Sequence, residues 1–371
     1  MRILHLIDSG GVYGAERILL HLASAQQQIG HEPWVVSMGR PGGGESELEA
    51  AARSRGLRVA PVRIAPRPTP GVVRTVLGAV RALSPDVLHS HGYKANILLA
   101  LVPRHERGPM LATLHGWTSS NRLSKLWLYE RLDRWALRRL DAVVVVARSM
   151  LTLPAFRGFP AGKLHVIANG IPPRAEPLAA LGAGGVPALP QGLVAFMRRR
   201  PTLLAIGRLS AEKGFALLVE SFARARGPEC DWQLLVVGEG RERPALQAQI
   251  AALDLQEAVQ LGGYVEGADR LLGYAAGFVM SSFTEGMPLA LLEALQWSTP
   301  IIATRVGAIP ELLAERTDAR LIPPRDGPAL TAALQALVSA PVACQVSASP
   351  DTTYTVAEMA EAYLRLYAAI T

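Results

Sequence analysis

Short apolar segments alternate with helical segments along the whole chain, and this alternation limits the fold more than any other feature. Such an alternation is typical of a parallel β-sheet that helices cover on both faces. The pattern runs through the first half of the chain, breaks, and restarts at Thr202. In the first half the apolar segments are residues 2–7, 34–38, 59–62, 86–91, 110–117 and 142–146. The sequence therefore predicts an α/β protein with two parallel-sheet domains.

A segment rich in Pro, Ala and Gly separates the two runs of this pattern, as is typical of an interdomain linker. The chain of 371 residues is also long enough for two domains. We expect a first domain over residues 1–172, a linker over 173–195 and a second domain over 196–350. We expect the last segment, 351–371, to contain a closing amphipathic helix.

The composition is that of a globular protein with a sizeable core, because 50% of the residues are hydrophobic and 19% are charged. No apolar run reaches the roughly 18 residues that a membrane-spanning helix needs. Residues 1–8 predict a first strand rather than a signal peptide. Cys230 and Cys344 have neither the number of a disulfide framework nor the spacing of metal ligands, so we expect a reducing, cytoplasmic location.

Positive charge is concentrated in the first half of the chain. Residues 1–171 contain 22 Lys and Arg against 11 Asp and Glu, a net +11, whereas the remainder contains 16 against 20, a net −4. A basic half indicates an anionic partner, either nucleic acid or a membrane surface. The chain lacks zinc-finger, RNA-recognition and basic-helix patterns, so we favour peripheral contact with the anionic inner face of the plasma membrane and expect no nucleic acid. The alternative is that the excess of arginine serves only solubility and binds no partner.

Two glutamates, Glu285 and Glu293, stand eight positions apart in a segment of good helix formers. Pro288 suits a first helical turn, where its missing N–H needs no partner. In a continuous helix the two glutamates would be about 12 Å apart along the axis and roughly 80° apart around it. Glu285 would then lie at a helix N-terminus formed by Gly286 and Met287, where N–H groups favour a phosphate. Glu293 would accept hydrogen bonds from two ribose hydroxyls. Two unrelated surface carboxylates are the alternative.

This segment and two that follow it resemble the retaining glycosyltransferases of family GT4, which have the GT-B fold. The following segments are TPIIAT at 299–304 and GAIPE at 307–311. Residues 207–214, with the sequence GRLSAEKG, resemble the phosphate-binding loop of the family. The resemblance covers essentially the whole chain, and the chain departs from the family pattern at Ala147, Arg148, Pro172 and Ser298.

The resemblance implies two Rossmann-like, doubly wound domains that face each other across a cleft. The first would bind the acceptor and the second the nucleotide sugar, and the C-terminal helix would cross back to the first. The implied catalytic residues are His115, Arg208, Lys213 and Glu285. The implied substrate- and nucleotide-binding residues are Gly10, Gly11, Gly14, Gly207, Arg208, Lys213, Gly238, Tyr264, Glu285, Gly286, Met287, Pro288, Leu289 and Glu293.

Histidines are expected at two strand ends, His91 and His115, where ligands bind in parallel sheets. The setting of His115, Thr-Leu-His-Gly-Trp, resembles the active-site histidine motif of the family, in which the histidine contacts the donor sugar. His89 and His91 could form a metal pair, because residues i and i+2 of a strand share one face. The sequence offers no third ligand beside them, so we favour packed or hydrogen-bonded histidines.

Residues 122–139 combine Trp127, Trp135, several leucines and many cations at helical spacing. A core helix with one solvated face has this pattern, and so does a helix that lies on a membrane surface. We favour the core helix and keep the membrane-surface helix as the alternative.

The chain contains no Asp-x-Asp motif, so we expect neither a metal nor another cofactor at the diphosphate. Arg208, Lys213 and a helix N-terminus would instead stabilise the leaving nucleoside diphosphate. The resemblance implies a hexosyltransferase that acts with retention on a UDP- or GDP-linked sugar. Its acceptor would be a glycan or a polyprenyl- or lipid-linked intermediate of polysaccharide or lipopolysaccharide biosynthesis. The alternatives are an isomerase of the UDP-GlcNAc 2-epimerase type, a phosphorylase-like enzyme and a non-catalytic nucleotide-sugar-binding protein.

Overall fold

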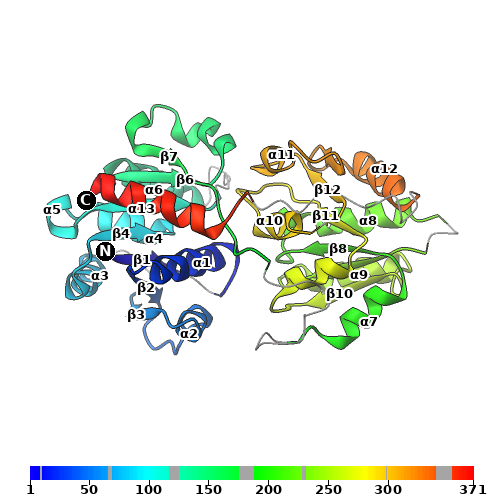
Figure 1. Cartoon of the computed structure of the whole chain (residues 1–371), viewed down its shortest axis with the longest axis horizontal. Helices are drawn as coiled ribbons and strands as arrows, with labels where there is room; N and C mark the ends of the chain where they lie inside the picture. The colour runs from blue at the N-terminus through cyan, green and yellow to red at the C-terminus, as the bar shows by residue number, and fades with distance from the viewer. Residues whose placement is uncertain are drawn as a thin grey trace. The chain divides into compact units, whose positions relative to one another are not determined.

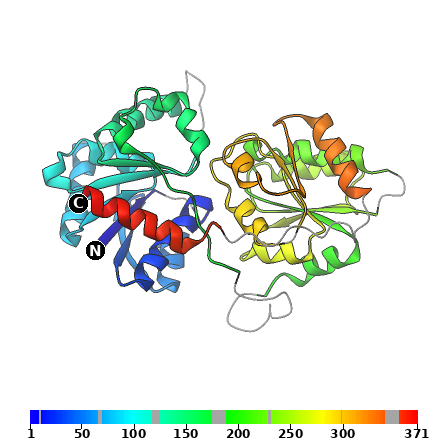
Figure 2. The ribbon, with the colours of Figure 1, turned by 45° about the horizontal axis from the view of Figure 1, so that its top comes forward.

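The structure, a computed structural model, describes residues 1–8, 11–65, 69–116, 125–174, 188–227, 231–297, 299–339 and 353–371. The chain forms two compact units (Figures 1 and 2). Unit 1 consists of Met1–Pro172 and Tyr354–Thr371, and unit 2 consists of Pro173–Thr353. Both chain termini therefore belong to unit 1.

Unit 1 is built on a seven-stranded parallel sheet in the order β3-β2-β1-β4-β5-β6-β7. The strands are β1 (Arg2–Ile7), β2 (Glu32–Gly39), β3 (Arg58–Arg63), β4 (Val87–Ser90), β5 (Met110–Leu114), β6 (Ala142–Val145) and β7 (Leu164–Val166). All residues of β4, β5 and β6 are buried, as expected of strands that helices cover on both faces.

The helices of unit 1 begin where the sequence carries start signals. In α2, Ser46 and Glu49 form a capping box, and α3 follows the cap residue Thr69 and begins with Pro70. The helices are α1 (Gly14–Gln28), α2 (Glu47–Ser54), α3 (Pro70–Leu83), α4 (Tyr93–Ala100), α5 (Arg104–Arg107), α6 (Lys125–Arg139) and α13 (Val356–Ile370).

The helix α6 confirms the core-helix prediction on one of its faces. Asp133 is buried and accepts a hydrogen bond from Asn96 Nδ2 of α4 at 2.9 Å, and burial raises the pKa of this carboxyl to about 6. The opposite face is exposed and carries Leu128, Leu132 and Trp135 at helical spacing, with the exposed Arg139 stacked over the ring of Trp135. Among the described residues, no helix is long and apolar enough to cross a membrane.

Unit 2 is built on a six-stranded parallel sheet in the order β10-β9-β8-β11-β12-β13. The strands are β8 (Thr202–Ile206), β9 (Gln233–Val237), β10 (Val259–Gly263), β11 (Gly277–Met280), β12 (Ile301–Thr304) and β13 (Ala319–Ile322). The helices are α7 (Gln191–Arg199), α8 (Phe215–Ala225), α9 (Arg243–Ala252), α10 (Leu289–Leu295), α11 (Ile309–Leu312) and α12 (Gly327–Val338). The prediction of parallel α/β sheets is thus confirmed in both units.

The predicted linker over 173–195 ends too late. The helix α7 begins at Gln191, inside the predicted linker, and buries Leu193 and Met197 in unit 2. An apolar pair four residues apart on one helix face is enough to attach this segment to the core. Residues 175–187 of the predicted linker lie outside the described residues.

The closing helix α13 returns to unit 1, as we predicted. Thr355, its N-cap residue, pairs with Ile171 in a parallel bridge, and Thr355 and Glu358 form a capping box. In Figure 1 the helix lies beside α1, and the two helices are in contact. Its tyrosines Tyr363 and Tyr367 are 2% and 0% exposed, so this helix is a part of the core of unit 1.

Each sheet has one place where the strand order reverses direction. In unit 1 this place lies between β1 and β4, and in unit 2 it lies between β8 and β11. In open parallel sheets, ligands bind beyond the carboxyl ends of the strands at such a switch point. The candidate sites are therefore the loops that follow these four strands.

Candidate active site

The loops after β8 and β11 bring two predicted site residues of unit 2 together. Lys213 Nζ lies 2.6 Å from Glu285 Oε1, although the residues are 72 positions apart in the chain. Ser282 Oγ donates to the same oxygen of Glu285 at 2.6 Å. The Glu285 side chain is 9% exposed and the Lys213 side chain is 24% exposed. The switch point of unit 2 therefore holds a largely buried ion pair.

Glu285 does not lie in a helix, and our prediction of a helix that includes it is wrong. The helix α10 begins at Leu289 with Pro288 as its N-cap residue, so Gly286 and Met287 precede it. The ion pair with Lys213 fixes Glu285, and the carbonyl of Gly286 accepts a hydrogen bond from Ala308 N at 2.8 Å. These tertiary contacts outweigh helix propensity, which is a weak preference. The predicted 12 Å spacing of the two glutamates, which assumed a continuous helix, does not apply.

Two glycines that sequence reasoning left out of the site allow this loop to pack. Gly307 has φ +54°, and a Cβ there would lie 2.4 Å from the carbonyl oxygen of Glu285. Gly214 has φ +67°, and a Cβ there would lie 2.3 Å from the carbonyl oxygen of Ser281. Any larger residue would displace the backbone that carries Glu285 or Lys213. Gly214 ends the segment GRLSAEKG and Gly307 begins the segment GAIPE, so their places in these two motifs could have identified them.

The second predicted cation, Arg208, lies on the same loop and is half-exposed. Its guanidinium donates to Glu212 Oε1 at 2.8 Å, and its side chain is 53% exposed. Burial acts to raise the pKa of Glu212, but hydrogen bonds from Ser210, the backbone and Arg208 outweigh it and lower that pKa to about 2. Glu212 is therefore a firm counter-ion for Arg208.

The other predicted residues of unit 2 also lie beyond the carboxyl ends of strands or in α10. Gly207 directly follows β8, and its N–H donates to the carbonyl of Val237 at 2.9 Å. Gly238 and Tyr264 directly follow β9 and β10, and Tyr264 is 67% exposed. The buried residues of the set are Gly286, Met287, Pro288, Leu289 and Glu293, of which Glu293 is 6% exposed in α10.

In unit 1 the loop after β1 leads into α1. Gly14 is the first residue of α1, and an added Cβ would meet no atom within 4 Å. Gly11 precedes it on the loop, whereas Gly10 lies outside the described residues. Asp8, which sequence reasoning missed, forms an ion pair of 2.5 Å with Lys94 of α4 and joins the loops after β1 and β4. An acidic residue directly after a first strand was the signal for it.

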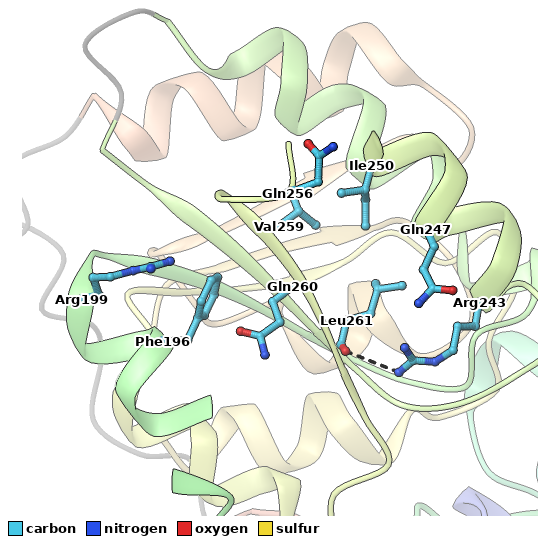
Figure 3. A pocket seen from close by; sticks show the side chains of 9 residues that line it. All are labelled: Phe196, Arg199, Arg243, Gln247, Ile250, Gln256, Val259, Gln260 and Leu261. Carbon is cyan, nitrogen blue, oxygen red and sulfur yellow. Dashed lines mark hydrogen bonds between the residues drawn. The ribbon is translucent and has the colours of Figure 1, made fainter. Parts of the chain in front are cut away.

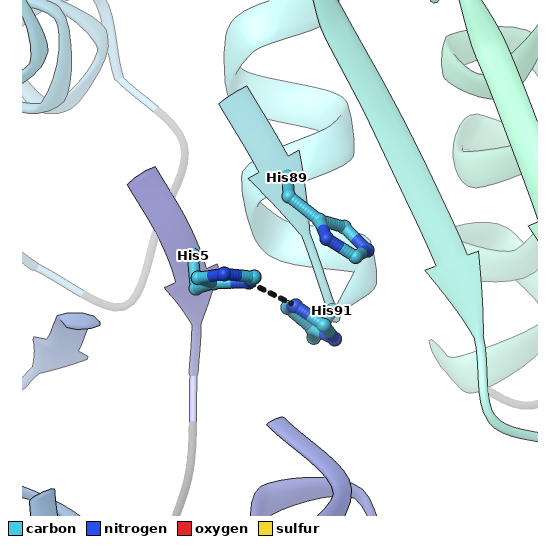
Figure 4. A group of neighbouring side chains, drawn as sticks. All are labelled: His5, His89 and His91. Carbon is cyan, nitrogen blue, oxygen red and sulfur yellow. Dashed lines mark hydrogen bonds between the residues drawn. The ribbon is translucent and has the colours of Figure 1, made fainter. Parts of the chain in front are cut away.

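His115 directly follows β5 and belongs to a cluster of four histidines in unit 1. His5 of β1, His89 of β4 and His91 lie together in the sheet (Figure 4), and their ligand nitrogens lie within 4.8 Å of one another. His91 Nδ1 lies 3.0 Å from His115 Nε2. Our expectation that no third ligand stands beside His89 and His91 is therefore wrong, because β1 and β4 are neighbours and place His5 there.

The three clustered histidines are nevertheless hydrogen-bonded at both ring nitrogens of each ring. His5 bonds His91 and Gln26, His89 bonds Tyr367 and Thr113, and His91 bonds His5 and His115. A metal ion would have to displace several of these bonds. Burial lowers the pKa of His5 and of His115 to about 4 and the pKa values of His89 and His91 well below their usual range. All four rings are neutral at pH 7.

A hollow of about 510 Å³ lies at the edge of the second sheet, away from the switch point of that sheet. Figure 3 shows its lining side chains, which come from α7, α9, β10 and the segment between α9 and β10, with Arg243 donating to the carbonyl of Leu261 at 3.4 Å. It borders the edge strand β10 rather than the loops that hold Lys213 and Glu285. We therefore place the candidate site at the switch points and not in this hollow.

Two family models match separate parts of the chain. The model described as Glycosyl transferases group 1 matches residues 200–340, and the model described as Glycosyltransferase Family 4 matches residues 12–175. The first match contains all six strands of the sheet of unit 2, and the second contains β2 to β7 of the sheet of unit 1.

Individual proteins with similar sequences include two bacterial enzymes. Glycogen synthase of Mycobacterium tuberculosis is 28% identical over 280 residues, which cover 72% of this chain and 64% of that protein. The chain thus spans just under two thirds of this relative. A lipopolysaccharide core biosynthesis glycosyltransferase of Rhizobium meliloti, LpsE, is 26% identical over 309 residues, which cover 82% of this chain and 79% of LpsE.

Solved structures resemble the whole chain. The Anabaena protein HepE, in complex with UDP and glucose, has a TM-score of 0.83 at 18% identity, with 100% of both chains covered. Sucrose-phosphate synthase from Thermosynechococcus elongatus has a TM-score of 0.75 at 18% identity, again with 100% of both chains covered. At such identity the likeness shows the fold. With two adjacent family matches and this architecture, the chain belongs to the group 1 glycosyltransferases of family GT4 and has the GT-B fold.

Proposed function

We propose that this protein transfers a hexose from a UDP- or GDP-linked sugar to an acceptor, with retention at the anomeric carbon. The observation that carries the proposal is the ion pair of Lys213 and Glu285 at the switch point of unit 2. A cation and a carboxylate side by side suit a ligand that carries both phosphates and hydroxyls. The structure of HepE with UDP and glucose, which shares the fold, supports this class of donor.

In the proposed reaction Lys213 and Arg208 bind the diphosphate of the donor. Both cations are paired with carboxylates, Glu285 and Glu212, in the structure. The Lys213 ammonium has three N–H donors, so it can bind the diphosphate while it still faces Glu285, whose other lone pairs accept hydrogen bonds from hydroxyls of the sugar. Glu293 of α10 would bind the ribose. Glu285 thus keeps its counter-ion, which avoids leaving a buried charge uncompensated.

The transfer itself needs a leaving diphosphate that is stabilised as negative charge develops on it. The bond between the anomeric carbon and the phosphate oxygen breaks, and the bond to the acceptor oxygen forms on the same face of the sugar. The proton of the acceptor hydroxyl passes to an oxygen of the leaving phosphate. Preorganised cations at that position lower the barrier, and the side chains of Arg208 and Lys213 carry the required charge.

Calorimetric titration with UDP, GDP, ADP and their sugars tests the donor directly. Thermal-shift measurements with the same ligands give a second test, because ligand affinity also appears as a stability gain. We expect binding that persists in EDTA. Arg208→Ala should weaken diphosphate binding and lower transfer about tenfold to a few hundredfold, as the loss of one charge-assisted bond implies. Arg224→Ala is the matched control, because Arg224 forms an equivalent exposed pair with Glu220 on α8. Full activity of Arg208→Ala, or loss of wild-type activity in EDTA, would contradict the proposal.

Incubation of the protein with nucleotide sugars in the absence of an acceptor separates transfer from the alternatives. Epimerisation of UDP-GlcNAc would identify an isomerase, and sugar phosphate formed from added phosphate would identify a phosphorylase. If the protein binds nucleotide sugars but turns none of them over when acceptors are added as well, a non-catalytic nucleotide-sugar-binding protein would be supported.

For the acceptor we propose a polyprenyl- or lipid-linked glycan reached by peripheral contact with an anionic membrane. The exposed face of α6 supports this, because Leu128, Leu132 and Trp135 stand beside exposed Arg131 and Arg138. An apolar face bordered by cations is the surface that an anionic bilayer attracts. The lipopolysaccharide core function named for LpsE is consistent with such an acceptor.

A further inference from the structure

A continuous chain of hydrogen bonds runs from the core of unit 1 to His115. Gln26 Oε1 of α1 lies 2.8 Å from His5 Nε2, and His5 Nδ1 lies 3.0 Å from His91 Nε2 (Figure 4). His91 Nδ1 lies 3.0 Å from His115 Nε2. Each neutral imidazole has one N–H and one lone pair, so the tautomer of one ring dictates that of the next.

The amide oxygen of Gln26 sets the direction of this chain. A carbonyl oxygen only accepts, so His5 carries its hydrogen on Nε2 and accepts at Nδ1. His91 must then donate from Nε2 and accept at Nδ1. His115 in turn must donate from Nε2, which leaves a lone pair at its Nδ1.

The partner of the amide nitrogen fixes which way the Gln26 amide faces. Gln26 Nε2 lies 3.3 Å from the hydroxyl of Tyr367, which itself lies 2.7 Å from His89 Nδ1. A separation of 3.3 Å is nearer to the range of N–H···O bonds, which reaches about 3.2 Å, than to that of O–H···O bonds, which reaches about 3.0 Å. The nitrogen of the amide therefore faces Tyr367, and the tyrosine O–H donates to His89.

The far end of the chain supports the same direction. His115 Nδ1 is buried and has no hydrogen-bond partner among the described residues. The opposite direction would place a hydrogen there, and a buried N–H without an acceptor is rarer and costlier than an unpaired lone pair. Two independent features, at opposite ends of the chain, thus select one set of tautomers.

We propose that Gln26 and Tyr367 are positioning residues that, through His5 and His91, hold His115 in the Nε2–H tautomer, so that a substrate hydroxyl that displaces the atoms covering Nδ1 meets a lone pair there and not an N–H. This inference rests on the proposed function for the identity of that hydroxyl as one of the donor sugar. The lowered pKa values of the four rings support it, because neutral rings keep one donor and one acceptor each. The closing helix α13 thereby sets the chemistry of a residue on the loop after β5.

The tautomer can be measured in the full-length free protein by nitrogen NMR with labelled histidine, since protonated and unprotonated ring nitrogens have separate shifts. The His115 signals are identified by their loss in His115→Gln. We expect hydrogen on Nε2 of His115 in the wild type. In Gln26→Leu the chain loses its terminal acceptor, and the ratio of the two His115 tautomers should change by about fivefold or more toward Nδ1–H.

Two tyrosines on α13 give a matched pair that removes a single oxygen each. Tyr367→Phe releases the amide of Gln26 and should shift the His115 ratio in the same direction. Tyr363→Phe is the control, because Tyr363 is equally buried but bonds Thr113 at 2.8 Å, off the chain from Gln26 to His115. Transfer should fall in parallel with the tautomer shift in Tyr367→Phe and should stay at the wild-type rate in Tyr363→Phe.

Hydrogen on Nδ1 in the wild type would overturn the inference. Wild-type ratios in both Gln26→Leu and Tyr367→Phe, or an equal shift in Tyr363→Phe, would overturn it as well. Because the NMR measurement needs no substrate, its outcome is independent of the proposed function, which the nucleotide titrations test separately.

Discussion

At the residue scale, the cations of the candidate site are paired before a ligand binds, but they are paired in different surroundings. The Lys213 side chain is 24% exposed and faces Glu285, whereas the Arg208 side chain is 53% exposed and faces Glu212. Attraction between charges is stronger where water is excluded, and exposed pairs contribute little to stability. A ligand therefore recruits Arg208 at little cost, and Lys213 with Glu285 forms the fixed part of the site.

The two glutamates should have separable roles. In Glu285→Gln the side chain keeps its shape but loses the charge that faces Lys213. We expect transfer to fall about tenfold to a few hundredfold, since one charge-assisted bond is lost, with nucleotide affinity retained. In Glu293→Gln we expect mainly a weaker affinity for the nucleotide. Calorimetry and transfer rates on the same preparations check both outcomes, and equal nucleotide losses in the two variants would refute the assignment.

Acid should destabilise the protein in a window set by the buried histidines. An unfolded histidine has a pKa of about 6.5, whereas the pKa values of His5 and His115 are about 4 in the folded protein. Below pH 6.5 the unfolded chain binds protons that the folded protein does not, so the free energy of unfolding decreases as the pH falls toward 4. Each such histidine contributes at most about 1.4 kcal/mol per pH unit. Asp133 acts in the opposite direction, because its raised pKa of about 6 means that the folded protein binds this proton more readily than the unfolded chain does, but it is a single group.

Urea unfolding midpoints measured between pH 7.5 and 5 check this dependence before most carboxylates titrate. The variant His5→Gln should show a shallower slope than the wild type. The control is His105→Gln, because the His105 side chain is 81% exposed and lies outside the buried cluster. A stability that does not change over this range would contradict the neutral histidine cluster.

At the scale of elements, local patterns predicted helices at α6 and α13 but not the start of α10. Leu289 to Glu293 have good helix propensity, whereas the four residues before them, which include Gly286 and Pro288, form a loop. What holds that loop is remote in sequence, namely Lys213, Ser282 and Ala308. The end of the linker was missed for the same reason, because only the folded core of unit 2 shows that Leu193 and Met197 of α7 are buried.

Gly14 allows the fold to be separated from ligand binding on one element. It begins α1, its φ is not in the left-handed region, and an added Cβ would meet no atom within 4 Å. Gly14→Ala should therefore leave the unfolding free energy within about 0.5 kcal/mol of the wild type or raise it slightly. If the donor phosphate or the acceptor approaches this helix start, transfer should fall at least tenfold. Unfolding curves and transfer rates measure the two effects, and unchanged transfer would remove Gly14 from the site.

The opposite result is expected at Gly307, which serves as the comparison. A Cβ there would lie 2.4 Å from the carbonyl oxygen of Glu285, at φ +54°. Gly307→Ala should lower stability and transfer together, since the loop that carries Glu285 must move. Wild-type stability in this variant would show that the loop is more adaptable than its packing indicates.

At the scale of the whole molecule, the alternation of apolar and helical segments was enough to predict two parallel sheets, and the family resemblance implied the return of the last helix. It was not enough to predict the histidine chain. His5, His91, His115 and Tyr367 come from β1, from the loops after β4 and β5, and from α13, and they are brought together by the strand order and by the packing of α13 on unit 1. Single-sequence patterns describe neighbours along the chain, so they do not reveal which side chains meet through tertiary structure.

The charge asymmetry of the sequence persists when it is counted by structural unit. Unit 1 contains 23 Lys and Arg against 13 Asp and Glu, a net +10, and unit 2 contains 15 against 18, a net −3. Near an anionic surface each cation contributes about 1 kcal/mol, and the attraction decays within a Debye length. A few cations beside the exposed apolar face of α6 would give reversible membrane attachment that salt releases.

Flotation with phosphatidylglycerol vesicles tests this attachment. We expect the protein to float with these vesicles at low salt, to remain behind at high salt, and not to float with neutral vesicles. Leu132→Glu on the exposed face of α6 should abolish flotation, because it places an anion in the apolar face that meets the bilayer. Leu253→Glu is the matched control, since Leu253 of unit 2 is 39% exposed against 37% for Leu132. Flotation that is equal on neutral vesicles, or equal in both variants, would refute docking through α6, and a water-soluble acceptor would then be the better proposal.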